Sequence, residues 1–195
     1  MCKFRGGWLS IIWRVLYLSW VAGEIVIAIG TRQRSHAKES QDRGTQVLLW
    51  FVIVLSLTAA GFLEALVPAS FRWHAAWLRP LSLILMIFGV AVRAAAIATL
   101  GRWFTANVVT QPEQQLQRGG LYSLVRHPSY LGMEIIFVAI GLHSRAWPAL
   151  IVGVVPPTIA VLHRIRVEET ALVHAFGESY LEYCRATKRL VPGVY

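Results

Sequence analysis

The chain has 195 residues, a net charge of +9 and 56% hydrophobic residues, and only 15% of its residues are charged. Soluble domains carry about 25% charged residues, so this chain lacks the polar side chains that a water-exposed surface requires. The composition therefore excludes an ordinary soluble domain and indicates an integral membrane protein. Its basic residues are dispersed rather than grouped in a stripe, which argues against nucleic-acid binding.

Five apolar runs follow one another along the chain, at residues 8–30, 47–69, 78–100, 130–142 and 147–162. The first three contain about 20 residues each, enough to cross roughly 30 Å of hydrocarbon. The last two are shorter and meet at a tight break, which predicts an antiparallel helical hairpin packed against the longer helices. We predict an all-α, polytopic membrane protein with about five transmembrane helices. A soluble core built from the same runs is the alternative.

The first run differs from a secretory signal. It is longer than the apolar core of such a signal and carries Arg14 and Glu24, so we interpret it as a permanent helix. Twelve Lys and Arg residues fall in segments 31–46 and 101–129 and in the tail from residue 163, against five on the other side. Because positive loops stay in the cytosol, this bias predicts an outside N-terminus and a cytosolic C-terminus.

Metal and nucleotide signatures are missing from the sequence. Cys2 and Cys184 fall on opposite sides of the predicted membrane, so we expect no disulfide between them, and neither lies in a metal-ligand spacing. The chain contains no P-loop and no glycine motif of a dinucleotide-binding fold. We therefore expect no metal and no Rossmann domain.

A dense polar motif begins at residue 120 and ends at residue 132. Within it, Pro128 suits the first position of a helix, where its missing N–H would have no partner anyway. The free N–H groups that follow favour an anion beside His127 and Tyr130. Gly132, one turn further, would leave room for a ligand against the backbone. An interfacial helix start without further function is the alternative interpretation.

Acidic residues follow the last apolar run. Arg164 and Glu168 are four residues apart and share one helical face, whereas the adjacent Glu169 points about 100° away from Glu168. A solvated surface helix with one ion pair is the alternative to a site here. We predict that a short amphipathic C-terminal helix covers about residues 168–184.

Four ionisable residues lie within or near the predicted spans: Glu24, Glu64, Arg93 and Glu134. Ionisable groups in a membrane are functional candidates by default. We interpret these four as mainly structural, with Glu134 paired to an Arg or a His.

Taken together, the motifs resemble the isoprenylcysteine carboxyl methyltransferase family and, more loosely, the phospholipid N-methyltransferases. The resemblance rests on Gly-x-Tyr-x-x-x-Arg-His-Pro-x-Tyr-x-Gly, on Glu-Glu after the hairpin, and on Phe-Gly-x-x-Tyr-x-x-Tyr and Arg-Leu-Val-Pro-Gly near the C-terminus. It covers roughly residues 100–195, and the first three runs match only as generic membrane helices. It implies that S-adenosylmethionine binds in a pocket closed by the C-terminal segment and leaves as S-adenosylhomocysteine.

The resemblance also implies roles for individual residues. Glu168 would hold the amino group of the cofactor, and Arg164 would orient the substrate carboxylate as the substrate-binding and catalytic residue. The other implied cofactor contacts are Gln114, Gln115, Leu116, Gln117, Tyr122, His127, Pro128, Ser129 and Tyr130. No catalytic base is expected, because a carboxylate is already deprotonated at neutral pH.

The function implied by the resemblance is carboxyl methylation of an isoprenylated cysteine, with the lipid tail arriving through the membrane. A lipid-amine or small-thiol methyltransferase is an alternative, and so is a non-catalytic lipid-binding scaffold. We expect one membrane domain, residues 1–195, in which residues 1–100 form three helices and residues 101–195 form the cofactor-binding and catalytic half. The site would face the cytosol of a prokaryotic plasma membrane, without nucleic acid or metal.

Overall fold

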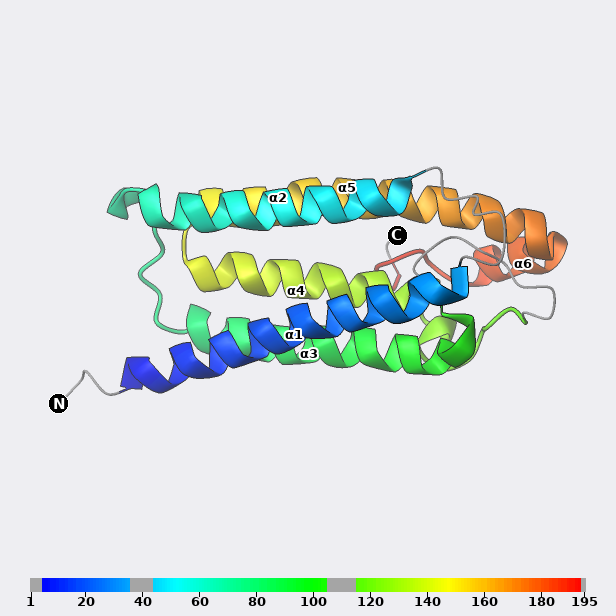
Figure 1. The fold of residues 1–195 in the computed structure, drawn as a ribbon, viewed down its shortest axis with the longest axis horizontal. Coiled ribbons are helices and arrows are strands. Elements are labelled where there is room, and N and C mark those ends of the chain that lie inside the picture. Colours follow the sequence, from blue (N-terminus) through cyan, green and yellow to red (C-terminus); the bar gives the residue numbers. More distant parts are fainter. Residues whose placement is uncertain (1–4, 36–43, 105–114, 194–195) are drawn as a thin grey trace.

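The computed structural model describes residues 5–35, 44–104 and 115–193 (Figure 1). This part of the chain contains six α-helices and no β-strand, which confirms the all-α prediction. The helices are α1 (Arg5–Ser35), α2 (Thr45–Leu66), α3 (Leu78–Leu100), α4 (Pro128–Ser144), α5 (Trp147–Phe176) and α6 (Glu178–Ala186). Three short 3₁₀ turns lie between them: η1 (Ala69–Phe71), η2 (Gly101–Trp103) and η3 (Gly120–Ser123).

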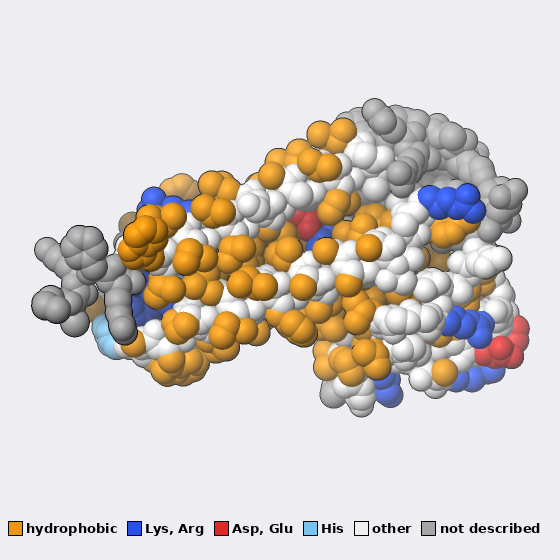
Figure 2. Space-filling model, turned by 90° about the horizontal axis from the view of Figure 1, so that it is seen from below, with side chains coloured by type: hydrophobic (Ala, Val, Ile, Leu, Met, Phe, Trp, Pro, Cys, Tyr) orange, Lys and Arg blue, Asp and Glu red, His pale blue; other side chains and the backbone are white. Residues whose placement is uncertain are grey.

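Four helices in the described part of the chain are long and apolar enough to cross a membrane: α1, α2, α3 and α5. Helix α4 has 17 residues, because it begins at Pro128 and ends just before the hairpin turn, and it falls short of this criterion. The described residues thus contain four candidate spans, whereas the sequence predicted about five. Figure 2 shows hydrophobic side chains along the length of the bundle and most of the charged ones near its ends, as lipid contact requires.

The predicted hairpin is confirmed, since α4 and α5 are antiparallel and in contact (Figure 1). Helix α4 lies between α3 and α5, while α2 packs on α5 and α1 packs on α3. The C-terminal ends of α1, α3 and α5 meet the N-terminal ends of α2 and α4 at one end of the bundle, beside α6 (Figure 1). The described parts of the polar segments, such as residues 31–35 and 115–129, therefore share one end of the structure.

The predicted C-terminal helix has different boundaries in the structure. Helix α5 continues without a break to Phe176, so Glu168 lies within α5 and not at the start of a new helix. Gly177, with a φ of 54°, ends α5, and α6 begins at Glu178. A change from apolar to polar residues does not end a helix, whereas a glycine in an uncommon backbone conformation does. This continuity places Arg164 and Glu168 rigidly on a membrane helix.

Two glycines bring α3 and α4 into backbone contact. A Cβ atom at Gly132 would lie 2.8 Å from the Cβ of Arg93 and 2.8 Å from the carbonyl oxygen of Gly89. A Cβ atom at Gly89 would likewise meet the carbonyl oxygen of Gly132 at 2.9 Å. The expectation that a ligand lies against Gly132 is therefore wrong, because helix α3 occupies that place.

Substitution of Gly132 by alanine is expected to push α3 and α4 apart. An added methyl group in such a tight crossing lowers the free energy of unfolding by about 2 kcal/mol. Gly61→Ala is the matched control, since a Cβ atom there meets nothing within 4 Å. Thermal unfolding in detergent measures both variants. Equal stability of Gly132→Ala and Gly61→Ala would contradict the close crossing.

Candidate functional site

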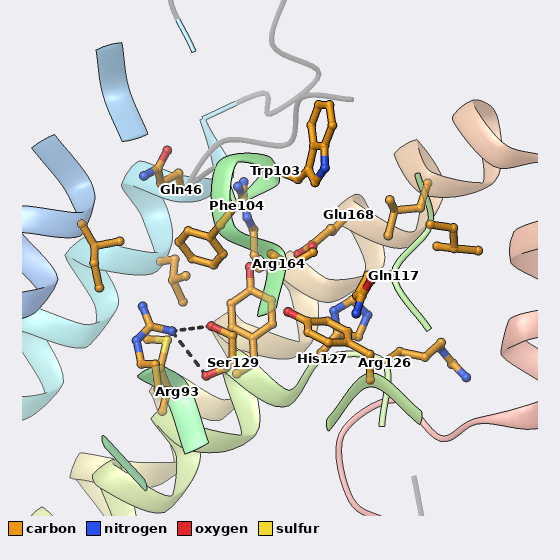
Figure 3. Close-up of a pocket in the computed structure, with 18 of the residues that line it drawn as sticks. Gln46, Arg93, Trp103, Phe104, Gln117, Arg126, His127, Ser129, Arg164 and Glu168 are labelled. Atoms are coloured by element: carbon orange, nitrogen blue, oxygen red, sulfur yellow. Dashed lines mark hydrogen bonds between the residues drawn. The ribbon is translucent and has the colours of Figure 1, made fainter. Parts of the chain in front are cut away.

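A pocket opens at the end of the bundle where α6 lies (Figure 3). All six helices contribute to its walls, together with residues 103–104, 115–117, 122 and 126–127. The residues predicted from the sequence that line it are Gln115, Leu116, Gln117, Tyr122, His127, Ser129, Tyr130, Arg164 and Glu168. Pro128 is fully buried and does not line the pocket, and Gln114 lies outside the described residues.

The N-terminal end of α4 lines this pocket. Pro128 occupies the first turn, as predicted, and His127 is the N-cap residue without a side-chain capping bond. The preceding backbone is held by the C-terminal segment, because Arg126 N donates to the Lys188 carbonyl at 2.8 Å and His127 N donates to the Arg189 carbonyl at 3.0 Å. The side chains of His127 and Ser129 are buried at 4% and 8% exposure. These hydrogen bonds to the C-terminal segment therefore fix the backbone just before the first turn of α4.

Arg164 and Glu168 lie one turn apart on α5, and both line the pocket (Figure 3). Arg164 is 2% exposed and donates through Nη1 to the Thr45 hydroxyl at the start of α2. The Tyr130 phenol lines the same pocket and interacts electrostatically with both residues. A guanidinium, a phenol and a carboxylate thus meet at one point of a largely apolar pocket, which is suited to binding a ligand with separated charges.

Glu169 faces away from the pocket and is buried in a cluster of basic residues. Its Oε1 accepts from Arg126 Nε at 3.0 Å and lies 3.4 Å from His127 Nε2, while its Oε2 accepts from Arg189 Nε at 2.7 Å. Arg126 also donates through Nη1 to the Cys184 carbonyl at 3.1 Å and to the Thr187 carbonyl. Glu169 therefore ties α5 to the start of α4 and to the C-terminal segment.

Glu169→Gln is expected to destabilise the protein, because it leaves two buried or half-buried guanidinium groups without their counter-charge. Loss of such charged hydrogen bonds lowers the free energy of unfolding by about 2 kcal/mol. Glu178→Gln is the matched control, since the Glu178–Arg185 pair is exposed and such pairs contribute about 0.5 kcal/mol. Thermal unfolding of the two variants tests this, and equal shifts in Tm would contradict it.

Tyrosines from η3 and α6 form another wall. Burial raises the pKa of the Tyr122 and Tyr180 phenols above their usual value near 10, and it raises the pKa of Tyr183 to about 12. These phenols therefore stay neutral and can donate hydrogen bonds. The Tyr183 hydroxyl donates to the Tyr122 carbonyl, which joins α6 to η3. The C-terminal helix thus closes this side of the pocket.

Comparison with known proteins points to the same family as the sequence motifs. Residues 82–174 match the model of the "Isoprenylcysteine carboxyl methyltransferase (ICMT) family". The chain is 37% identical over 122 residues to the protein-S-isoprenylcysteine O-methyltransferase of Xenopus laevis. It is 35% identical over 120 residues to protein-S-isoprenylcysteine O-methyltransferase A of Arabidopsis thaliana. Residues 82–174 are therefore similar to the isoprenylcysteine carboxyl methyltransferase family.

The similarity to these relatives covers 60% of this chain in both cases. This corresponds to 40% of the Xenopus protein and 61% of the Arabidopsis protein. A longer match, 30% identity over 147 residues, relates 74% of the chain to 62% of the cobalt-zinc-cadmium resistance protein CzcN of Cupriavidus metallidurans. The chain therefore spans only part of the length of the curated relatives that it matches.

The family match runs from residue 82, inside α3, to residue 174, whereas the predicted resemblance covered roughly residues 100–195. The third apolar run is therefore part of the family segment, and the expectation that it is generic is wrong. It contributes Arg93, which donates through Nη1 to the Ser129 hydroxyl at 2.8 Å in the first turn of α4 (Figure 3).

The sequence analysis missed pocket residues outside the motif. Glu24 of α1 and Arg93 of α3 line the pocket, and their charges within apolar runs were the available signal. Gln46, Trp50 and Trp103 line it as well, and nothing in their spacing distinguishes them from other residues at helix ends. The walls contributed by α1 and α2 lie outside the family match.

Glu134 does not have the partner that we expected. Its Oε2 accepts a hydrogen bond from the Thr158 hydroxyl at 2.6 Å, and no Arg or His bonds to it among the described residues. Thr158 also donates to the Val154 carbonyl at 2.8 Å. Glu134 thus joins α4 to α5 and is not among the residues that line the pocket.

Proposed function

We propose that this protein is an S-adenosylmethionine-dependent methyltransferase that methylates the carboxylate of an isoprenylated cysteine. The observation that carries the proposal is the meeting of Arg164, Glu168 and the first turn of α4 in one pocket, within the segment that is similar to the family. The names of the Xenopus and Arabidopsis relatives support the choice of acceptor.

The pocket residues fit S-adenosylmethionine by their chemistry. When bound, this cofactor supplies a methyl group on a positively charged sulfur. Glu168 would accept hydrogen bonds from its amino group, a charged contact about twice as strong as a neutral one. The start of α4 at His127 presents the positive end of the helix dipole, which favours a carboxylate. Neutral phenols at Tyr122 and Tyr130 add hydrogen-bonding groups to the same pocket.

Arg164 would bind the acceptor carboxylate. Its planar guanidinium matches the geometry of a carboxylate, and its bond to Thr45 restrains its orientation. No residue has to remove a proton, because the acceptor is already ionised at neutral pH. The protein then contributes by aligning the acceptor and excluding water. This explains why a general base is not required in the pocket.

The apolar tail of the acceptor would lie between α1 and α2. Ile27 and Ala28 of α1 and Leu49 and Trp50 of α2 line the same pocket as Arg164, and both helices are candidate membrane spans. A prenyl chain could therefore stay in hydrocarbon while its carboxylate reaches the guanidinium. The twelve-to-five bias of basic residues supports a cytosolic position for this end of the bundle.

Shortening the prenyl group is expected to raise the KM of the acceptor steeply. Each CH₂ group withdrawn from an apolar site forfeits about 0.8 kcal/mol, so removal of one five-carbon isoprene unit raises KM by about two to three orders of magnitude. The KM of the cofactor should change less than about twofold, since Glu168 and α4 do not contact the tail. Steady-state kinetics with geranyl-, farnesyl- and geranylgeranyl-cysteine provide the measurement. Indifference to chain length would contradict a lipid-embedded tail.

Methyl transfer from labelled S-adenosylmethionine tests the proposed function directly. The purified protein in lipid nanodiscs is offered a panel of prenylcysteine, lipid-amine and small-thiol acceptors. We expect label on prenylcysteine that mild alkali releases as methanol, since esters hydrolyse and N-methyl or S-methyl groups do not. Alkali-stable label on an amine or thiol would refute the carboxyl reaction. Failure to bind S-adenosylhomocysteine would favour a scaffold.

A further inference from the structure

Glu24 and Arg93 form a nearly buried ion pair between two membrane helices. Glu24 lies in α1 and Arg93 in α3, and they are 5% and 7% exposed. Arg93 Nη2 donates to Glu24 Oε2 at 2.6 Å, and Arg93 Nε donates to Glu24 Oε1. The same Oε1 accepts from Trp20 Nε1 at 3.0 Å. The carboxylate is therefore held on both oxygens and in turn holds two sides of the guanidinium fork.

The remaining side of the fork reaches the start of α4. Arg93 Nη1 donates to the Ser129 hydroxyl at 2.8 Å and to the Ser129 carbonyl at 3.3 Å (Figure 3). Ser129 lies in the first turn of α4 and lines the pocket together with Glu24 and Arg93. The close crossing of Gly89 and Gly132 brings α3 near enough for this contact. The three side chains form a chain of hydrogen bonds from α1 to the pocket.

The order of these contacts gives Glu24 a specific task. A guanidinium cannot lose its proton, so a buried Arg93 requires an anion beside it. Without Glu24, Arg93 would share the pocket with Glu168, the other acid among the described residues that line it, and with any bound carboxylate. Glu24 thus keeps the charge of Arg93 on the α1 side and leaves Nη1 directed at Ser129.

We infer that Glu24 is a positioning residue: it orients Arg93, which in turn fixes Ser129 and the first turn of α4 for cofactor binding. The inference rests on the proposed function, because it concerns the same cofactor pocket. It makes α1, which lies outside the family match and packs mainly on α3, a part of the site. An ion pair that only held α1 to the bundle would affect stability without a specific effect through Ser129.

Glu24→Gln tests the inference through binding of S-adenosylhomocysteine, measured by calorimetry on the full-length protein. The glutamine keeps the shape but removes the counter-charge, and we expect the Kd to rise about tenfold. Glu134→Gln is the matched control, since it also changes a carboxylate in the bundle but does not line the pocket, and its Kd should stay within about twofold. In a Ser129→Ala background, Glu24→Gln should change the Kd clearly less than tenfold, because only the longer bond from Arg93 to the carbonyl of residue 129 remains.

Three outcomes would overturn the inference. The first is an unchanged Kd in Glu24→Gln, and the second is a full tenfold change in the Ser129→Ala background, which would show that Glu24 does not act through Ser129. If Glu24→Gln does not fold, the double variant Glu24→Gln, Arg93→Gln removes the buried charges together. This double variant should recover the wild-type Tm and still bind S-adenosylhomocysteine weakly. Wild-type affinity in the double variant is therefore the third outcome that would overturn the inference. Absence of binding by the folded wild type would instead refute the proposed function and, with it, this inference.

Discussion

Arg164→Lys is expected to lower kcat/KM for a prenylcysteine acceptor by about a hundredfold, while the Kd for S-adenosylhomocysteine changes less than about threefold. Lysine keeps the positive charge but lacks the planar fork that would hold a carboxylate in line with the methyl group. The loss should therefore appear in turnover and in the KM of the acceptor. Steady-state kinetics and calorimetry on the same preparation separate the two effects.

Arg166→Lys is the matched control for this substitution, because Arg166 lies two residues further on the same helix and is exposed. It should leave kcat/KM unchanged. Since Arg164 also bonds to Thr45 of α2, the Tm of Arg164→Lys has to be measured beside its rate. A rate near wild type would remove Arg164 from the acceptor site and favour an amine or thiol acceptor, which has no carboxylate to hold.

Glu168→Gln is expected to raise the Kd for S-adenosylhomocysteine by about 10- to 100-fold, with little change in Tm. A desolvated hydrogen bond between a carboxylate and an ammonium group contributes that much, and the amide of glutamine replaces it poorly. Glu168 lines the pocket, whereas Glu169 is bound to Arg126 and Arg189 behind it. Glu169→Gln should therefore show the reverse pattern, a lower Tm and a smaller change in Kd.

The comparison of these neighbouring variants tests the face assignment of α5. Binding is measured by calorimetry below the unfolding transition of both variants, so that the population of unfolded protein does not enter the Kd. Equal increases in Kd for Glu168→Gln and Glu169→Gln would show that the ion-pair cluster behind the pocket controls binding as strongly as the pocket carboxylate. The proposed role of Glu168 would then be wrong.

The sequence alone determined the helical class, the hairpin, the helix start at Pro128 and the shared face of Arg164 and Glu168. Each depends on properties within a few residues: the length of an apolar run, the missing N–H of proline, and the 3.6-residue period. The motif around residues 120–132 was recognisable for the same reason, since its residues are adjacent in the chain. Where a local rule was incomplete, as at the end of α5, the predicted boundary was wrong.

Tertiary structure decided which partners these residues have. Glu169 bonds to Arg126 across 43 residues, and Glu24 bonds to Arg93 across 69 residues, so neither pair could follow from helical spacing. The same holds for Gly132, whose role depends on α3 crossing α4 at Gly89. Charges buried among apolar helices must find a partner wherever packing provides one. The packing of α1 on α3 and of α3 on α4 therefore decided how the first helices reach the pocket.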